Sequence, residues 1–159
     1  MGGAETEVSD VTVNVLLEAA CFKPSSVGRT SRRLGLISEA SQRFERGVDP
    51  NGCAAAADRA AQLIAETAGG EVAPGIVDAY PKTIEPLILS LRMERVNSLL
   101  GTELTAEVVT GILRRLCLNV IAEGDILRVS VPTFRPDLVR EVDLIEEVVR
   151  VHGLSLIHI

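Results

Sequence analysis

Aromatic residues are scarce in this 159-residue sequence: they make up 3% of the chain, and tryptophan is absent. Proteins that bind single-stranded nucleic acid stack the bases on aromatic side chains, so a surface of that kind is not expected here. Basic residues are also outnumbered, and the net charge is −6. Phosphate neutralisation needs a concentrated basic surface, so the charge argues against a chain that grips nucleic acid by itself.

Cysteine and long apolar runs are scarce as well. The three cysteines, Cys21, Cys53 and Cys117, lie far apart without a C-x-x-C spacing, which predicts neither a disulfide framework nor a zinc site. No apolar run approaches the roughly 18 residues of a spanning helix, and the N-terminus has no basic-then-apolar signal. We therefore expect a cytoplasmic protein that is neither secreted nor membrane-spanning.

The remaining composition, 47% hydrophobic and 24% charged, is that of one globular domain or two small ones. Alternating apolar and polar residues predict a strand over 11–17. Pro24 in a first-turn position and Gly35 as a stop predict a helix up to Leu34. A longer, alanine-rich helix is expected after Asp49 and Pro50, up to residue 68, with a surface of small residues that can pack closely against a sheet.

A stretch rich in glycine and proline follows, and it predicts a domain boundary with a linker over 81–86. Residues 1–80 would form one domain and 87–153 another, and the fold class would be α+β. The second domain is expected to contain strands at 87–91, 119–122 and 126–131, and helices at 94–100, 105–116 and 138–151. Helices followed by a two-stranded ribbon resemble a winged-helix-like module.

The last predicted helix combines an apolar face with acidic residues. Leu138, Val142, Ile145 and Val149 would share the apolar face, which indicates a core. On the opposite face, acidic residues stand at three neighbouring positions, Asp143, Glu146 and Glu147, and a fourth acid, Asp137, lies six residues earlier near the expected helix start.

Two interpretations of these acidic residues stay open from spacing alone. In one, they form a solvated face and pair with Arg140 and Arg150 at helical spacing. In the other, they bind a hard cation, because crowded carboxylates repel one another and Mg²⁺ accepts carboxylate and water oxygens.

The order of residues adds a resemblance to a family. The run from Val131 and Pro132 through Arg135-Pro136-Asp137-Leu138 to Gly153 is similar to the metal-carrying, winged-helix-like domain of the β subunit of bacterial-type phenylalanyl-tRNA synthetases. In that family, acids at four matching positions bind magnesium near the contact with the α subunit. The resemblance therefore implies a Mg²⁺ site made of Asp137, Asp143, Glu146 and Glu147.

The upstream half resembles the end of the same family's editing domain, in a mixed α/β fold. The similarity lies in the runs at 7–10, 14–20 and 30–36 and in the block from Glu39 to Pro50. The family's editing pocket hydrolyses tRNA mischarged with tyrosine, and the resemblance carries pocket positions onto Gly2, Gly3, Glu18, Ser38 and Ala40. Paired glycines let a ligand approach backbone amides, and small side chains leave room for a ring. A tight turn, a strand-end carboxylate and close packing are the structural alternatives.

The resemblance implies a fragment of a ligase β subunit that supports ATP-dependent charging of tRNA with phenylalanine. The partner α subunit would bind ATP and carry the aminoacylation site, in a heterotetramer of two α and two β subunits. Residues 154–159 depart from the family's usual continuation, and we expect this tail to be foreign. A free-standing aminoacyl-tRNA editing hydrolase and a winged-helix nucleic-acid-binding module are the alternatives.

Overall fold

The computed structural model describes residues 6–153. These residues form helices together with a small three-stranded antiparallel sheet, and the predicted α+β class is confirmed. They divide into two compact units. The first unit contains residues 6–20 and 53–78, and the second contains 21–52 and 79–153. The predicted division into residues 1–80 and 87–153 stays a prediction, and the tail at 154–159 lies outside the described residues.

The first unit contains one regular element, α3 (Cys53–Ala68). The strand predicted over 11–17 is wrong, because this segment has no regular structure and no neighbouring strand in the described part of the chain. Val13 and Leu16 are 89% and 98% exposed. A strand forms only where a second strand satisfies its backbone groups, so an alternating pattern alone is not sufficient.

Helix α3 follows a single 3-10 turn, η1 (Pro50–Gly52), and ends at Gly69, whose φ of 70° suits glycine. The predicted alanine-rich helix is thereby confirmed, apart from its tighter first turn. None of the residues of α3 is buried. The close packing against a sheet that its small residues suggest is therefore not formed within the described residues.

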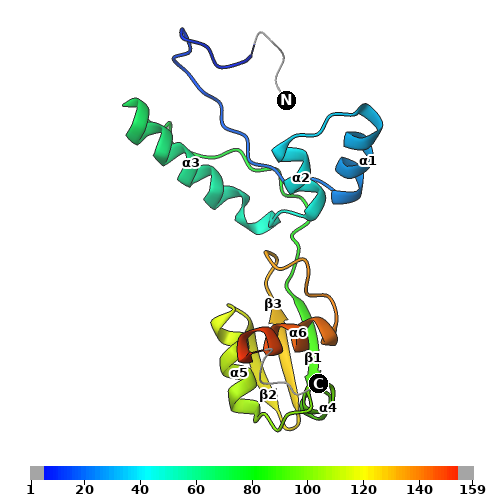
Figure 1. Ribbon diagram of the computed structural model, residues 1–159. Helices are drawn as coiled ribbons and strands as arrows, with labels where there is room; N and C mark the ends of the chain where they lie inside the picture. Colours follow the sequence, from blue (N-terminus) through cyan, green and yellow to red (C-terminus); the bar gives the residue numbers. More distant parts are fainter. Residues whose placement is uncertain (1–5, 154–159) are drawn as a thin grey trace. The chain divides into compact units, whose positions relative to one another are not determined.

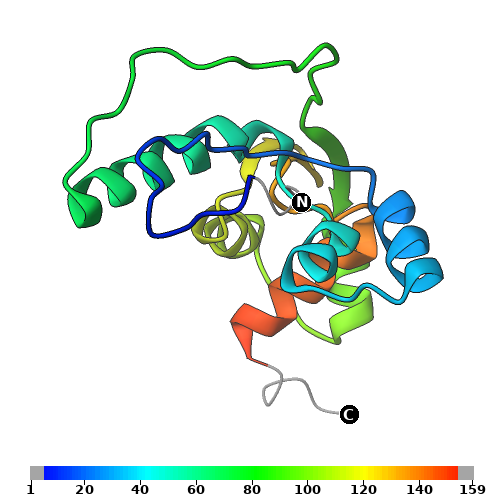
Figure 2. The same ribbon diagram turned by 90° about the horizontal axis from the view of Figure 1, so that it is seen from above.

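In the second unit, α1 (Pro24–Leu34) and α2 (Glu39–Arg46) pack against each other (Figure 2). The predicted bounds of α1 are confirmed, because Pro24 opens the helix and Gly35 closes it at a φ of 65°. An edge-to-face contact joins the rings of Phe22 and Phe44, whose centroids lie 4.9 Å apart. Aromatic pairs in this geometry add to the stability that burial gives, so two of the few aromatic residues hold the helix pair together.

The sheet of the second unit has the strand order β1-β3-β2 (Figure 1). β1 (Leu87–Arg92) pairs with β3 (Ile126–Val131), which forms a hairpin with β2 (Asn119–Glu123). The hairpin turns at Gly124, where φ is 62°. Three helices complete the module: α4 (Met93–Leu100), α5 (Ala106–Arg115) and α6 (Glu141–His152). The predicted elements from residue 87 onward are confirmed, except that α6 starts three residues later than expected.

One hydrophobic core serves this module, and its members come from the sheet, from the three helices and from the loop before α6. The fully buried large side chains are Leu91, Val96, Val109, Leu113, Val120, Leu127, Val129, Leu144 and Val148. The expected apolar face of α6 needs two corrections. Val142 is 41% exposed, and Glu147 is buried, although it was expected on the solvated face. None of the helices formed by residues 6–153 has the length and apolar character to cross a membrane.

Candidate functional site

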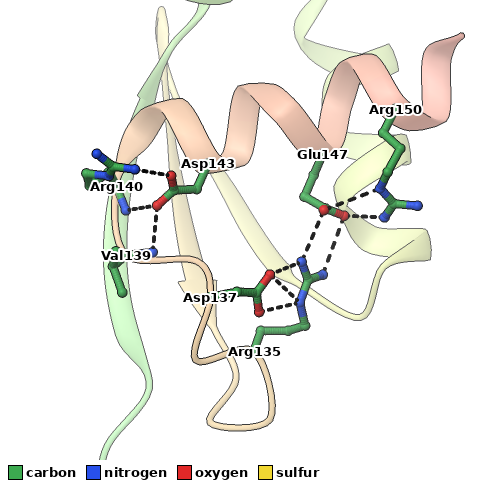
Figure 3. A network of polar contacts seen from close by, with 7 residues as sticks. All are labelled: Arg135, Asp137, Val139, Arg140, Asp143, Glu147 and Arg150. Atoms are coloured by element: carbon green, nitrogen blue, oxygen red, sulfur yellow. Dashed lines mark hydrogen bonds and ion pairs between the residues drawn. The ribbon is translucent and has the colours of Figure 1, made fainter. Parts of the chain in front are cut away.

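The candidate site is the loop between β3 and α6 together with the inward side of α6 (Figure 3). Two turns shape the loop, because the Arg135 N–H donates to the Pro132 carbonyl and the Leu138 N–H donates to the Arg135 carbonyl. Leu138 inserts into the core and is 3% exposed. This anchor fixes the backbone next to Asp137, so the side chain of Asp137 projects from a defined position.

Arg135 binds Asp137 through a two-pronged contact. Its Nε donates to Oδ1 at 3.0 Å, and its Nη2 donates to Oδ2 at 2.6 Å. A planar guanidinium group matches a carboxylate in this fork geometry, and such charge-assisted pairs are stronger than neutral hydrogen bonds. Hydrogen bonding from Arg135 lowers the pKa of Asp137 below its usual range. Hydrogen bonding to Asp137 in turn raises the pKa of Arg135, and both groups remain charged.

Glu147 lies between two arginines on the inward side of α6. Arg150, one turn further along the helix, donates to both carboxylate oxygens. The Nη2 of Arg135 lies 3.1 Å from Oε1 of Glu147. Hydrogen bonds from Arg150, and then from Arg135, hold the pKa of Glu147 below its ordinary value despite its burial. A buried carboxylate is tolerated only with such partners, and Glu147 has two.

Asp143 occupies the first turn of α6 and caps it. Its Oδ2 accepts hydrogen bonds from the N–H groups of Val139 and Arg140, at 3.0 and 2.8 Å. Its Oδ1 accepts one from the Arg140 guanidinium at 3.0 Å. The backbone hydrogen bond from Val139, followed by the Arg140 side chain, lowers the pKa of Asp143. Asp143 thus satisfies backbone donors at a helix start, where a negative charge is favoured.

The structure therefore gives three of the four predicted magnesium ligands arginine partners. The pairing of Arg140 and Arg150 with acids of α6, expected under the solvated-face interpretation, is confirmed. Glu146 is exposed. Across residues 6–153, no group of three or more His, Cys, Asp or Glu side chains is arranged to hold a metal ion. The residues as placed do not fit Mg²⁺, and the magnesium site stays a prediction.

The predicted editing-pocket residues are spread over both units. Gly2 and Gly3 lie outside the described residues. Glu18 belongs to the first unit, where it lines a surface hollow of about 330 Å³ together with residues of α3. Ser38 and Ala40 belong to the second unit, at the start of α2. A common pocket for these residues stays a prediction.

Ser38 also has a clear local role. Its hydroxyl accepts a hydrogen bond from the Ser41 N–H at 3.1 Å, and its own N–H donates to the Ser41 hydroxyl at 2.9 Å. These two bonds form a capping box that starts α2. Any contact of Ser38 with a ligand would compete with this cap.

The sequence interpretation missed two charged groups that the structure makes central. One is Arg135. Its contact with Asp137, two residues away, could have been expected from the sequence, but its contact with Glu147, twelve residues away, could not. The other is Glu141, at the start of α6, which binds Arg92 at the end of β1 and Arg95 of α4. Helical spacing reports neighbours within one helix, so neither tertiary pairing could be read from it.

Comparison with protein families gives two consecutive matches. Residues 1–69 match the model of the B3/4 domain, and residues 89–154 match that of the tRNA synthetase B5 domain. The two matched regions follow one another along the chain and together cover most of it. The B3/4 match ends before the B5 match begins, so the two regions do not overlap.

Curated relatives match nearly the whole chain. The chain is 55% identical to the phenylalanine–tRNA ligase beta subunit of Moorella thermoacetica over 99% of its length, and 49% identical to that of Geobacter sulfurreducens, also over 99%. It spans 19% and 20% of these two relatives, so it corresponds to about a fifth of each. A solved N-terminal fragment of the phenylalanyl-tRNA synthetase beta subunit from Pyrococcus horikoshii matches 46% of the chain and 21% of that chain, with a TM-score of 0.43 and 20% identity.

Proposed function

Because the chain belongs to the family of phenylalanine–tRNA ligase β subunits, we propose that it is a fragment of such a subunit and supports charging of tRNA with phenylalanine. The observation that carries this proposal is the 55% identity to a curated β subunit over 99% of the chain. Two family modules in consecutive order support it further. The partner is an α subunit, which binds ATP and performs the aminoacylation, in a cytoplasmic heterotetramer of two α and two β subunits.

The contribution of this chain is a scaffold. The module from β1 to α6 has a well-packed core, and the loop before α6 is tied to that helix by the ion pair between Arg135 and Glu147. Such a rigid element is suited to hold a subunit contact, since ordering at the contact then costs little conformational entropy. We assign the acylation chemistry to the α subunit and give no residue of this chain a role in it.

A chimera tests the proposal. Residues 1–153 replace the matching fifth of the Moorella thermoacetica β subunit, and the chimera is produced together with the α subunit of that organism. We expect an assembled enzyme that charges tRNA with radiolabelled phenylalanine at a rate close to that of the parent. A chimera that is folded but neither binds the α subunit nor charges tRNA would overturn the proposal. The same replacement carrying Leu113→Asp, which places a charge in the core, is the control expected to fail.

For the upstream half, we propose a share in hydrolytic editing of tyrosyl-tRNA by the complete β subunit. Glu18 supports this, since an exposed carboxylate beside a hollow can accept a hydrogen bond from an ammonium or phenol group. In the chimera, Glu18→Gln is expected to slow deacylation of tyrosyl-tRNA several-fold while leaving phenylalanine charging intact. The matched control is Glu7→Gln, another exposed carboxylate of the first unit. Equal deacylation rates for the two variants would remove Glu18 from the site.

A further inference from the structure

We infer that Arg135 and Arg150 are the counter-ions of Asp137 and Glu147 in this chain, so that a divalent cation can bind these carboxylates only by displacing an arginine. The inference stands on the geometry of the four side chains. It holds whether or not the chain takes part in tRNA charging.

The charges of the four groups cancel. Two guanidinium groups face two carboxylates, and each oxygen of Glu147 is contacted by both arginines. Oε1 lies 3.1 Å from Nη2 of Arg135 and 3.4 Å from Nε of Arg150. Oε2 accepts from Nη1 of Arg135 at 3.5 Å and from Nη2 of Arg150. Crowded carboxylates attract a divalent cation through their uncompensated negative charge. Within this group of four side chains, no uncompensated charge remains.

The geometry of Arg135 also favours the arginine over a metal ion. Its side chain is 19% exposed, and that of Glu147 is 11% exposed, so the attraction between them is less weakened by water than in a surface pair. Mg²⁺ gives up its water ligands reluctantly and usually keeps several. A hydrated Mg²⁺ would have to replace a two-pronged contact to Asp137 and would leave the guanidinium group without partners in a partly buried place.

Arg135 is therefore a positioning residue. It links Asp137, in the loop, to Glu147, in the middle of α6, and so fixes the loop on the helix. The predicted metal would have linked the same two residues. In the structure, the Arg135 side chain makes this connection without a metal ion.

Thermal unfolding of the 159-residue chain tests the inference. The midpoint is measured in MgCl₂ and in KCl of equal ionic strength, and we expect the same midpoint in both. Arg135→Gln is expected to lower the midpoint by roughly 5 °C or more, because two carboxylates lose a shared cation. In this variant Mg²⁺ is expected to raise the midpoint, since it can now neutralise the negative charge that Arg135 no longer compensates. Arg115→Gln, which removes an exposed positive charge from α5, should show neither effect.

Two results would overturn the inference. One is a saturable rise of the wild-type midpoint with Mg²⁺ beyond that in KCl, which would mean that the ion outcompetes the arginines. The other is an Arg135→Gln variant with an unchanged midpoint and no response to Mg²⁺. If Arg135→Gln does not fold, Arg150→Gln replaces it, because the Arg150 side chain is 55% exposed. For Arg150→Gln we expect a smaller drop of the unfolding midpoint and a rise of that midpoint with Mg²⁺. If this variant unfolds at the wild-type midpoint and does not respond to Mg²⁺, the inference is contradicted.

Discussion

The carboxylate of Glu141, at the start of α6, accepts three hydrogen bonds from Arg92, at the end of β1. Oε1 accepts from the Arg92 backbone N–H at 2.9 Å and from its Nε at 3.0 Å, and Oε2 accepts from Nη2 at 2.6 Å. Arg95 of α4 approaches the same carboxylate at 3.3 Å. The two residues of the main pair are 49 positions apart in the sequence. Glu141 therefore ties the last helix of the module to its first strand.

Replacing Glu141 by glutamine should destabilise the second unit. Glutamine keeps an acceptor for the Arg92 N–H but loses the charge that faces two guanidinium groups. Since the Glu141 side chain is only 17% exposed, we expect a loss of about 1 kcal/mol in the free energy of unfolding. Urea unfolding followed by circular dichroism measures it. The matched control is Glu123→Gln, whose exposed carboxylate lies 3.7 Å from Arg128 and should matter little. Equal effects of the two substitutions would contradict the role of Glu141.

The sequence predicts well those elements whose ends carry their own signals. Pro24 and Gly35 bound α1, and Thr105 caps α5 by accepting a hydrogen bond from the Val108 N–H. Gly124 marks the hairpin turn. All of these are local effects of backbone geometry or capping, which act over three or four residues. They can be read without knowledge of the tertiary structure.

Features that depend on distant partners were not predictable. The segment 11–17 has the alternating pattern of a strand, but its pairing depends on other strands, and none pairs with it in the described part of the chain. The acids at 137 and 147 suggested a metal site through the resemblance to a family, because spacing alone left a solvated face open. Spacing could not show that Arg135 reaches both of them. The sequence thus indicated the acidic group and its pairing with Arg150, but not the part that Arg135 plays in it.

Cys117 is a position where substitution should stabilise the fold. It is the only non-glycine residue with positive φ among the described residues, at 63°, and it follows Leu116, the C-cap residue of α5. A side chain in the left-handed conformation is strained, and glycine is preferred at this place. Cys117→Gly should therefore raise the free energy of unfolding by about 0.5–1 kcal/mol. Urea unfolding is the measurement.

The control for Cys117→Gly is the opposite change at a similar φ. Gly124→Ala introduces a side chain where φ is 62°, and a loss of about 1 kcal/mol is expected. If both substitutions shift stability in the same direction, backbone strain is not the cause at Cys117.

Ser38→Ala should loosen α2 locally. The substitution removes the hydroxyl that accepts from the Ser41 N–H, and loss of such a cap costs about 1 kcal/mol, or roughly a fivefold drop in protection. Amide hydrogen exchange of the α2 residues measures this. Ser26→Ala, in the neighbouring α1, is the matched control and should leave α2 unchanged. Unchanged protection of α2 in Ser38→Ala would show that the capping box contributes nothing to its stability.

The core of the second unit can be tested at Leu113. Its side chain, on α5, is fully buried, and Leu113→Ala should cost about 2–5 kcal/mol through lost burial and the cavity that remains. Leu99→Ala removes the same atoms from a side chain on α4 that is 54% exposed and should cost less than about 1 kcal/mol. Chemical denaturation of both variants gives the comparison. Similar losses would mean that the core is not centred on α5 and the sheet.

Helix α3 should be far less stable than β3, although both are regular elements of one chain. A helix of 16 residues gains little stability from its own hydrogen bonds, and most helices in proteins depend on tertiary packing. None of the residues of α3 is buried, whereas Leu127, Val129 and Val131 of β3 lie in the core. Amide exchange should therefore show protection of roughly tenfold or less in α3 and at least about a thousandfold in β3.

The chain spans 19% of its Moorella thermoacetica relative, and the same measurement in a full-length chimera tests why α3 is weak. If α3 is weak only because nothing packs against it, the chimera should cover its alanine-rich side, and the protection of its amides from exchange should rise. Ala60→Lys and Ala61→Lys, each placing a charge on the small-residue surface, should cancel the rise in the chimera but leave the isolated chain unaffected. Strong protection of α3 already in the isolated chain would show that burial does not control its stability.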